Sequence, residues 1–275
     1  MTAFNREKYI GEAIKSVLAS NYVNWELIIT DDCSTDATFK IAQSYEQQDK
    51  RIKVYKNEAN LGDYPNRNRA ASYAKGEYLM NVDSDDLLHK GTMDKCLNLF
   101  RKYPLASFGI YCPNYSSDHL LSPVQAISKH FFEKPLLLIG PGGTIIKNKF
   151  FKQLGGFPTK YGPANDGYYN LNAASQTHTV LIPFELVYYR RHEGQEINNK
   201  YAYLYNNYLY LNDALRNIEL HLKASEKRFI IKKNKRRFLT NIVNFYLETK
   251  DWSRTTAALK TAKFNIRDLL AAIFH

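Results

Sequence analysis

Three aspartates in one short segment are the side chains of this sequence best suited to hold a cation. In the segment NVDSDDLL, residues 81–88, Asp83, Asp85 and Asp86 follow an apolar run. Carboxylates two positions apart at a strand-to-loop turn can converge on one ion, and oxygen ligands suit Mg²⁺, Mn²⁺ or Ca²⁺. An acidic loop that only caps the following helix has the same composition. Taken alone, the segment leaves a metal site and a helix cap both open.

Two other acidic motifs can be compared with this segment. An EF-hand loop beginning at Asp83 would need an acidic or amide side chain at its fifth position and glycine at its sixth. Those positions hold Leu87 and Leu88, so the segment is not an EF-hand. A phosphatase with a DxD nucleophile normally has Thr or Val shortly after the motif, whereas Asp86 and Leu87 stand here. The phosphatase hypothesis is therefore disfavoured, and it gives no role to a second acidic cluster.

That second cluster is IITDDCSTDAT, in which Asp31 and Asp32 follow a short β-rich run. A carboxylate at this point could accept the imide N–H of a pyrimidine or a ribose hydroxyl. Ser34, Thr35 and Asp36 then open a helix, where side-chain oxygens cap free N–H groups. Capping needs one acid rather than two, so we expect Asp31 or Asp32 to contact a ligand.

The elements around these clusters alternate between strand and helix patterns. Apolar residues recur at helical spacing from Tyr9 to Leu18, and further helices are expected after Thr35 and over residues 66–74. Strands are expected at residues 25–30, 52–55 and 77–82. Such alternation favours a mostly parallel sheet with flanking helices, in an α/β fold. In these sheets ligands bind beyond the carboxyl ends of the strands, where both acidic clusters and Asn57 fall.

The rest of the chain suggests a second, helical part. Residues 115–157 are less regular, and from about residue 201 the apolar pattern becomes helical. We therefore predict an α/β domain over residues 1–199 and a helical region over residues 200–275.

Net charge indicates an anionic partner. The 275 residues carry a net charge of +11, and residues 225–237 alone carry seven Lys/Arg against one acid. Both a solvated helix face and a surface that attracts anionic lipid fit this segment. No uncharged apolar run approaches the roughly 18 residues of a membrane-spanning helix, and no secretory signal is recognised, so we expect a cytoplasmic protein. The three cysteines form no CxxC pair and are expected to be reduced.

The order of several motifs resembles that of family 2 glycosyltransferases. The motifs are WELIITDDCSTDAT, NLGDYPNRNRAASYAKGEYLMNVDSDD, LGGF, NDGYYNL and VYYRRHEGQ, within a resemblance that runs from Phe4 to about His192. Members are inverting, nucleotide-sugar-dependent enzymes with the GT-A fold, which is Rossmann-like. The resemblance therefore implies transfer of a sugar from a nucleotide diphosphate sugar, with a UDP-sugar as the expected donor, to an acceptor hydroxyl.

The resemblance also implies which residues bind the donor. Thr2 to Asn5 match the first nucleotide-binding loop of the family. Asp31 or Asp32 would hold the base or ribose, and Arg67 and Asn68 match an arginine–asparagine pair beside the nucleotide.

The remaining motifs imply the metal site and the catalytic base. Asp83 would lie against the ribose or donor sugar, and Asp85, beside it, would bind Mn²⁺ or Mg²⁺ on the diphosphate. Asp166 would be the base that takes the proton of the acceptor hydroxyl, a role that requires direct reach to that proton. The segment near the diphosphate and acceptor is matched by Arg190, Arg191 and His192. Adjacent strand residues face opposite sides, so the two arginines are not both expected to point inward.

Two departures from the family pattern carry further expectations. Only Met1 precedes the first loop, where the family has an apolar strand, so we expect that central strand to be lacking and stability to be poor. Asn165 stands where the family usually has Glu, which puts in doubt whatever that Glu contributes.

The sequence predicts a metal-dependent glycosyltransferase of surface polysaccharide or glycolipid synthesis. Its partners would be a nucleotide-sugar donor, a saccharide or lipid-linked acceptor and, through the basic helix, the anionic inner face of the cell membrane, with no nucleic acid. The alternatives are a DxD phosphatase-like enzyme, a nucleic-acid binder that uses Lys232 to Arg237, and an inactive, truncated glycosyltransferase-like protein.

Overall fold

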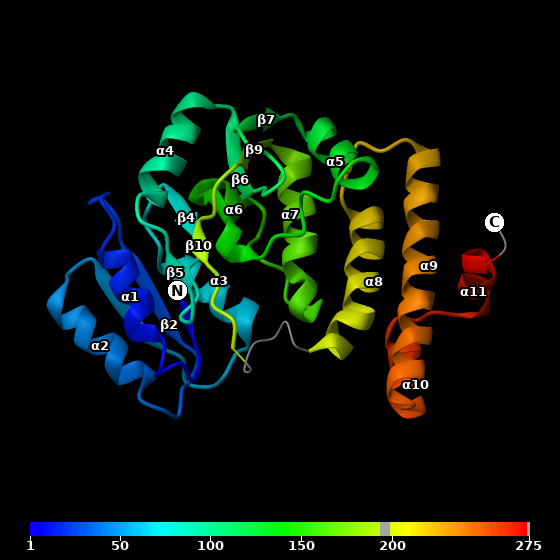
Figure 1. Ribbon diagram of the computed structural model, residues 1–275, viewed down its shortest axis with the longest axis horizontal. Coiled ribbons are helices and arrows are strands. Elements are labelled where there is room, and N and C mark those ends of the chain that lie inside the picture. The colour runs from blue at the N-terminus through cyan, green and yellow to red at the C-terminus, as the bar shows by residue number, and fades with distance from the viewer. Residues whose placement is uncertain (193–198, 274–275) are drawn as a thin grey trace.

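The computed structural model describes residues 1–192 and 199–273. Figure 1 shows strands with helices packed around them and a row of helices that ends the molecule on one side. The strands form a three-stranded sheet, a larger five-stranded sheet and a two-stranded pair. The expected α/β fold with a helical C-terminal region is confirmed.

The first sheet is parallel and follows the predicted alternation of strands and helices. Its strands are β1 (Thr2–Ala3), β2 (Leu27–Asp31) and β3 (Ile52–Lys56), in that order. All five residues of β2 are buried, which explains its continuous apolar sequence up to Asp31. The helices that connect these strands and lead onward are α1 (Ile10–Leu18), α2 (Thr38–Gln48) and α3 (Asp63–Tyr73).

Of the apolar strand expected to be lacking, the structure shows the two residues of β1. Thr2 pairs with Thr30 and Ala3 with Asp31, and the Met1 amino group donates a hydrogen bond to the Ile28 carbonyl at 2.8 Å. Burial lowers the pKa of this amino group to about 5. Met1 and Ala3 pack in one apolar cluster with Val82. The low stability expected from a short first strand stays a prediction.

The second sheet has five strands in the order β4 (Tyr78–Met80), β8 (Thr144–Lys147), β6 (Ala106–Tyr111), β9 (His178–Ile182) and β7 (His119–Leu121). Only the β6–β9 pair is parallel among these described strands. The molecule is therefore more antiparallel than the alternating pattern predicts. The difference arises in the segment 115–157, which inserts β7 and β8 as antiparallel neighbours.

The remaining elements of the α/β part surround this sheet. A short antiparallel pair joins β5 (Leu87–Leu88) to β10 (Val187–Tyr188). The helices are α4 (Thr92–Lys102), α5 (Pro123–Phe132), α6 (Asn148–Gln153) and α7 (Asn165–Gln176), with single 3₁₀ turns at Pro141–Gly143 and Gly162–Ala164.

The C-terminal part consists of α8 (Lys200–Asn217), α9 (Ala224–Thr249), α10 (Trp252–Thr261) and α11 (Ile266–Ile273). Helix α8 is buried on two sides. Leu211 and Ala214 join the core of the large sheet, whereas Leu204 and Tyr208 pack with Phe238 of α9 in a separate cluster. Within residues 1–192 and 199–273, no helix has both the length and the apolar character needed to span a bilayer.

Candidate active site

One cavity of 1540 Å³ lies where the carboxyl ends of β2 and β4 meet the start of α7. Eight of the twelve residues singled out in the sequence line it: Thr2, Asn5, Asp32, Arg67, Asp83, Asp85, Asp166 and Arg191. The other four, Asp31, Asn68, Arg190 and His192, lie behind this surface and support it. Carboxylates that are more than 130 positions apart in the chain thus face one space.

The two adjacent aspartates at the end of β2 have different hydrogen-bond partners and different roles. Asp32 lines the cavity and accepts hydrogen bonds from the Leu61 and Gly62 N–H groups at 2.8 and 2.9 Å, and from the Asn57 amide at 2.6 Å. It therefore holds the segment after β3 against the sheet. Asp31 is fully buried, and its Oδ2 accepts the Ser34 N–H at 3.0 Å. Within the described residues its Oδ1 has no hydrogen-bond partner.

The first loop is fixed at its turn by Asn5, which has a left-handed φ of 51°. Asparagine tolerates this conformation better than most residues. The Asn5 side-chain oxygen accepts the Thr35 N–H at 2.9 Å, and the Asn5 N–H donates to the Ser34 hydroxyl, also at 2.9 Å. The predicted nucleotide-binding loop is thus tied to the segment that follows Asp32.

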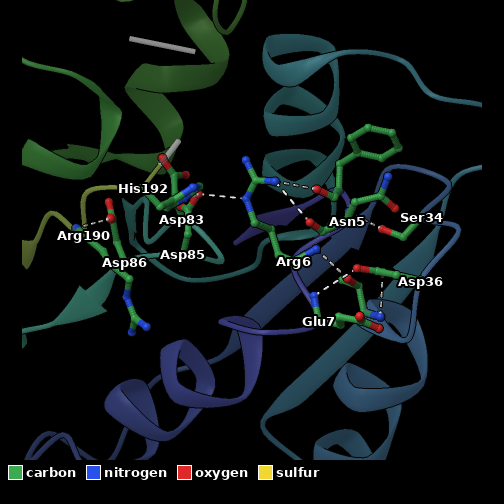
Figure 2. A network of polar contacts seen from close by, with 12 residues as sticks. Asn5, Arg6, Glu7, Ser34, Asp36, Asp83, Asp85, Asp86, Arg190 and His192 are labelled. Atoms are coloured by element: carbon green, nitrogen blue, oxygen red, sulfur yellow. Dashed lines mark hydrogen bonds and ion pairs between the residues drawn. The ribbon is translucent and has the colours of Figure 1, made fainter. Parts of the chain in front are cut away.

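Arg6 is a site residue that the sequence analysis missed. Its guanidinium donates to the Phe4 and Asn5 carbonyls at 3.2 and 3.1 Å, and its Nε donates to Asp85 Oδ2 at 2.9 Å (Figure 2). It therefore joins the first loop to the acidic turn after β4. The available signal was its position directly after the matched loop.

Arg67 and Asp83 form a buried ion pair in the cavity wall. Arg67, on α3, donates from Nη1 and Nη2 to the two carboxylate oxygens of Asp83 at 2.6 and 2.9 Å, and only 7% of its side chain is exposed. Burial alone would raise the pKa of Asp83, but the charge and hydrogen bonds of Arg67 outweigh it, so that pKa is lowered. Asp63, one turn earlier on α3, also pairs with Arg67 at 2.9 Å.

Asp85 meets a histidine from the far end of the domain. His192 Nε2 lies 2.9 Å from Asp85 Oδ2 (Figure 2), and the His192 ring stacks on Tyr9 with the centroids 4.8 Å apart. The hydrogen bonds of β10 with β5 bring this segment beside the acidic turn. Residues 193–195 of the predicted motif VYYRRHEGQ lie outside the described residues.

Asp86 completes this arrangement with a structural contact. It is 2% exposed, and its Oδ1 accepts the Arg190 N–H at 3.0 Å. Burial and the nearby charge of Asp83 raise the pKa of Asp86 to about 7. The side chain of Arg190 turns away to pair with Glu12 at 2.6 Å, whereas Arg191 faces the cavity. The two arginines thus point in different directions, although both lie beyond the end of β10, so strand alternation is not the cause.

Asp166 faces the cavity from the first turn of α7. Its Oδ1 accepts the Gly167 N–H at 2.7 Å, and burial raises the pKa of this carboxyl to about 6. Gly167 has no room for a side chain, since a Cβ would lie 2.9 Å from the Tyr210 ring. Asn165, which replaces the usual Glu of the family pattern, accepts the Tyr161 N–H and donates to the Gly162 carbonyl. It shapes the turn that presents Asp166.

Asn68 supports the site from outside the cavity. Its side chain donates to the Phe157 carbonyl and accepts the Phe157 N–H, both at 2.8 Å. It thereby fastens the LGGF loop, in which Gly155 and Gly156 have φ values of 80° and 77°. Both polar groups of the Asn68 amide are thus used within the protein, and its contact with the nucleotide stays a prediction.

We expect Asn68→Ala to destabilise the fold by about 1–3 kcal/mol, because it leaves two backbone groups of Phe157 without their partners. Urea unfolding would measure the loss. Ser72→Ala is the matched control on the same helix, since the Ser72 hydroxyl donates only to the exposed Arg69 carbonyl. Equal stability of the two variants would contradict the clamp.

The acidic turn can supply part of a divalent cation site. Asp85 Oδ2 and His192 Nε2 already approach one another, and Asp83 lies on the same turn. Among the described residues no three His, Cys, Asp or Glu side chains converge on one point. A Mg²⁺-type site that takes one or two protein ligands and completes its shell with phosphate and water fits this donor set.

Comparisons with known proteins agree with this geometry. A family model described as Glycosyl transferase family 2 matches residues 1–153. The UDP-Glc:alpha-D-GlcNAc-diphosphoundecaprenol beta-1,3-glucosyltransferase WfgD of Escherichia coli is 38% identical over 103 residues, which are 37% of this chain and 40% of WfgD. Two further curated relatives are matched over 38% and 37% of their own length, so the matched region spans less than half of these proteins.

Two solved structures share the fold. The Staphylococcus aureus TarS 1–349 structure in complex with UDP-GlcNAc superposes with a TM-score of 0.74 at 20% identity, over 98% of this chain and 80% of that one. The mannosyltransferase PcManGT from Pyrobaculum calidifontis, in complex with GDP-Man and Mn²⁺, gives 0.64 at 13% identity, over 98% and 81%. The GT-A fold implied by the motif order is therefore confirmed.

Proposed function

Because this chain belongs to glycosyltransferase family 2, we propose that it transfers a sugar from a nucleotide diphosphate sugar to an acceptor hydroxyl, with inversion at the sugar carbon. The observation that carries the proposal is the shared cavity. Its lining includes Asp83 and Asp85 of the acidic turn, Asp166 at the start of α7, and Thr2 and Asn5 of the first loop. These are the parts that a single displacement needs: a donor cradle, a diphosphate site and a base.

The donor nucleotide would lie along the first loop and the segment held by Asp32. Thr2 and Asn5 line this side of the cavity together with Leu61 and Gly62. The TarS complex contains UDP-GlcNAc, and the name of WfgD specifies UDP-Glc, which supports a UDP-sugar as the first donor to test. The GDP-Man complex of PcManGT makes GDP-sugars the second.

The transfer step uses Asp166 as the base. Its carboxylate takes the proton of the acceptor hydroxyl, the hydroxyl oxygen bonds to the sugar carbon, and the bond from that carbon to the diphosphate oxygen breaks. A carboxylate with a pKa of about 6 is a stronger base than one at the ordinary value, and it is still mostly ionised at pH 7. Arg191, which faces the cavity, is suited to the departing diphosphate because its planar guanidinium matches phosphate oxygens.

A divalent cation, Mn²⁺ or Mg²⁺, would be held by Asp85 and His192, and when bound it would neutralise charge on the diphosphate. The PcManGT complex with Mn²⁺ supports this role. Asp83 would contribute through its place beside Asp85, while Arg67 keeps it ionised.

We expect Asp85→Ala to weaken Mn²⁺-dependent donor binding by at least about tenfold, because few protein ligands hold the ion. Isothermal titration of UDP with and without Mn²⁺ would measure it. Asp36→Ala is the matched control, since Asp36 accepts the Thr38 and Glu7 N–H groups and lies outside the cavity lining. Metal-dependent binding that survives Asp85→Ala would contradict the assignment of the metal site.

The acceptor would be a saccharide, free or lipid-linked, at the cytoplasmic face of the membrane. The name of WfgD specifies a diphosphoundecaprenol-linked acceptor, and the basic residues 225–237 fit an anionic leaflet. In this proposal residues 1–199 form the catalytic domain, and residues 200–275 form a helical region that contributes part of the cavity wall and contacts the membrane.

The function is tested by incubating the protein with UDP-, GDP- and dTDP-sugars and Mn²⁺ and measuring release of the nucleotide diphosphate. We expect release with one nucleotide class, stimulated by saccharide acceptors and abolished by Asp85→Ala. Release of inorganic phosphate from simple phosphoesters, blocked by Asp83→Asn, would favour the phosphatase alternative instead. No release from any nucleotide sugar would favour an inactive glycosyltransferase-like protein.

A further inference from the structure

The positive charge of this protein is concentrated in its C-terminal helices. Residues 200–275 contain 15 of the 38 Lys/Arg residues but only 6 of the 27 Asp/Glu residues, so they carry +9 of the net charge of +11. The α/β part is therefore close to neutral. Figure 1 shows α9, α10 and α11 at the end of the molecule farthest from the first sheet.

One face of α9 combines this charge with exposed apolar side chains. We call it the α9 outer face and define it by the exposed residues Phe229, Lys233, Arg236, Val243 and Leu247. They lie on a single helix side at intervals of four, three, seven and four residues, with the exposed Thr240 in the longer interval, and no acidic residue interrupts them. Phe229, Val243 and Leu247 are 54%, 46% and 56% exposed. At 1.5 Å per residue, the face is about 27 Å long.

An aromatic corner continues this face at the junction with α10. Trp252 is 64% exposed and packs edge-on against Tyr246, with the ring centroids 5.5 Å apart. Lys250 lies over the Tyr246 ring at 5.8 Å. Tryptophan and tyrosine with an adjacent lysine are characteristic of side chains that lie at a membrane–water interface.

The corner is connected to the catalytic cavity through helix α8. The Tyr201 hydroxyl, on the first turn of α8, donates to the Arg254 carbonyl of α10 at 3.2 Å. Tyr203 and Asn207, on the same two turns of α8, line the cavity. Helix α8 therefore contacts α10, next to the aromatic corner, and also lines the cavity.

We propose that the α9 outer face and Trp252 dock on a lipid bilayer with anionic headgroups. The inference specifies the membrane contact that forms part of the proposed function, and it commits to lipid because the whole C-terminal part is cationic where the apolar side chains are exposed. Helices that lie in a membrane surface combine such an apolar stripe with Lys and Arg. Docking in this orientation holds α8, and hence the cavity wall, within a short distance of the bilayer.

The two tryptophans of the chain allow a direct test with the full-length protein. Trp25 is partly buried under the Arg51 guanidinium, 3.8 Å from its ring centroid, whereas Trp252 lies at the corner. In Trp25→Phe, the emission of Trp252 should shift to shorter wavelength when vesicles of 30% phosphatidylglycerol in phosphatidylcholine are added. In Trp252→Phe, the emission of Trp25 should not move. No shift of Trp252 overturns the proposal, even if every other variant fails to fold.

Vesicle sedimentation then identifies the face. Lys233→Glu should weaken binding by about 30-fold. Each unit of charge near an anionic leaflet contributes about fivefold, and this substitution replaces one positive charge with one negative charge, a change of two units. Lys53→Glu, on an exposed residue of β3, changes the net charge equally and should have little effect. Leu247→Asp should abolish measurable binding, whereas Leu105→Asp, at a site 66% exposed in the α/β part, should not.

Three outcomes would overturn the proposal: equal affinity of wild type and Leu247→Asp, equal effects of Lys233→Glu and Lys53→Glu, or a wild-type dimer that Leu247→Asp dissociates while vesicles do not bind. Binding to duplex DNA with no binding to vesicles would overturn it as well. Nucleotide release from a donor sugar in solution is measured separately, without vesicles. Failure of docking is therefore distinguishable from failure of the proposed transferase activity.

Discussion

Asp166→Asn is expected to lower the transfer rate by about 10³-fold while donor affinity changes by less than about twofold, which is the size of effect that loss of a general base produces. Asn has the shape of Asp but cannot accept the proton of the acceptor hydroxyl. Asn keeps the size of this side chain, whose Oδ1 accepts the Gly167 N–H of its own helix, so we expect the residues assigned to the nucleotide to keep their positions. Single-turnover transfer and titration with UDP would measure the two quantities.

The pH profile gives a second test of the same residue. Because burial raises the pKa of Asp166 to about 6, kcat/KM of the wild type should fall tenfold for each pH unit below 6. The raised value also means that the folded state holds this proton more tightly than the unfolded chain does. Stability from this group is thus greatest below about pH 4 and declines as pH rises to 6. Asp166→Asn removes that decline and should be at least as stable as the wild type at pH 7.

An active Asp166→Asn variant would remove Asp166 from the mechanism. Glu185→Gln is the matched control, since Glu185 also lines the cavity but is 56% exposed at its rim and lies outside the catalytic assignment. It should change the rate by far less than Asp166→Asn does. Similar losses in the two variants would indicate a general effect of charge in the cavity rather than a base at one position.

Arg67→Met is expected to lower the free energy of unfolding by about 2–4 kcal/mol, because removing one partner of a buried ion pair leaves the other charge uncompensated. Arg67 is 7% exposed and makes both hydrogen bonds to Asp83. The Asp83 side chain keeps 26% exposure toward the cavity, so water partly compensates it and the loss falls below that of a fully buried pair. Guanidinium unfolding at pH 7 would measure it.

The pH dependence distinguishes the ion pair from mere packing. A lowered pKa of Asp83 stabilises the folded protein above the ordinary pKa, and that stability is lost as pH falls through the folded value. The difference between wild type and Arg67→Met should therefore shrink below about pH 4. Arg69→Met, two residues away on α3, should cost less than about 1 kcal/mol because Arg69 has no buried carboxylate partner in its described contacts. A difference that does not change with pH would contradict the ion-pair explanation.

The sequence predicted the parts of the site that depend on local pattern. Strands that end at Asp31 and just before Asp83 follow from apolar runs, and parallel strands bring such ends together. The first loop and Asp166 required the family resemblance, because no local pattern states that the start of α7 faces β4. Local sequence patterns could not predict which residues far apart in the chain contact each other. Asp85 and His192 are 107 positions apart and meet through the β5–β10 ladder, whose strands are two residues long.

Side-chain roles within the motifs were also beyond sequence reasoning. The sequence does not distinguish Asp31 from Asp32. In the structure, Asp31 is buried and bonds to Ser34, whereas Asp32 holds the segment after β3. Asn68 was assigned to the nucleotide by its place beside Arg67. On a helix, adjacent residues point about 100° apart, and the contact of Asn68 with the LGGF loop was not predicted. The antiparallel sheet was missed because segment 115–157 has short strands without clear alternation.

Helix α8 has a consequence for how this protein can be divided. Its one side completes the core beneath the large sheet and its other side completes the core of the C-terminal helices. Separating the two halves at residue 199 or 217 would expose an apolar surface to water, which is energetically unfavourable. The two halves should consequently melt in one cooperative transition, and any recombination that exchanges membrane-docking helices between relatives would have to carry α8 with one half and rebuild its contacts with the other.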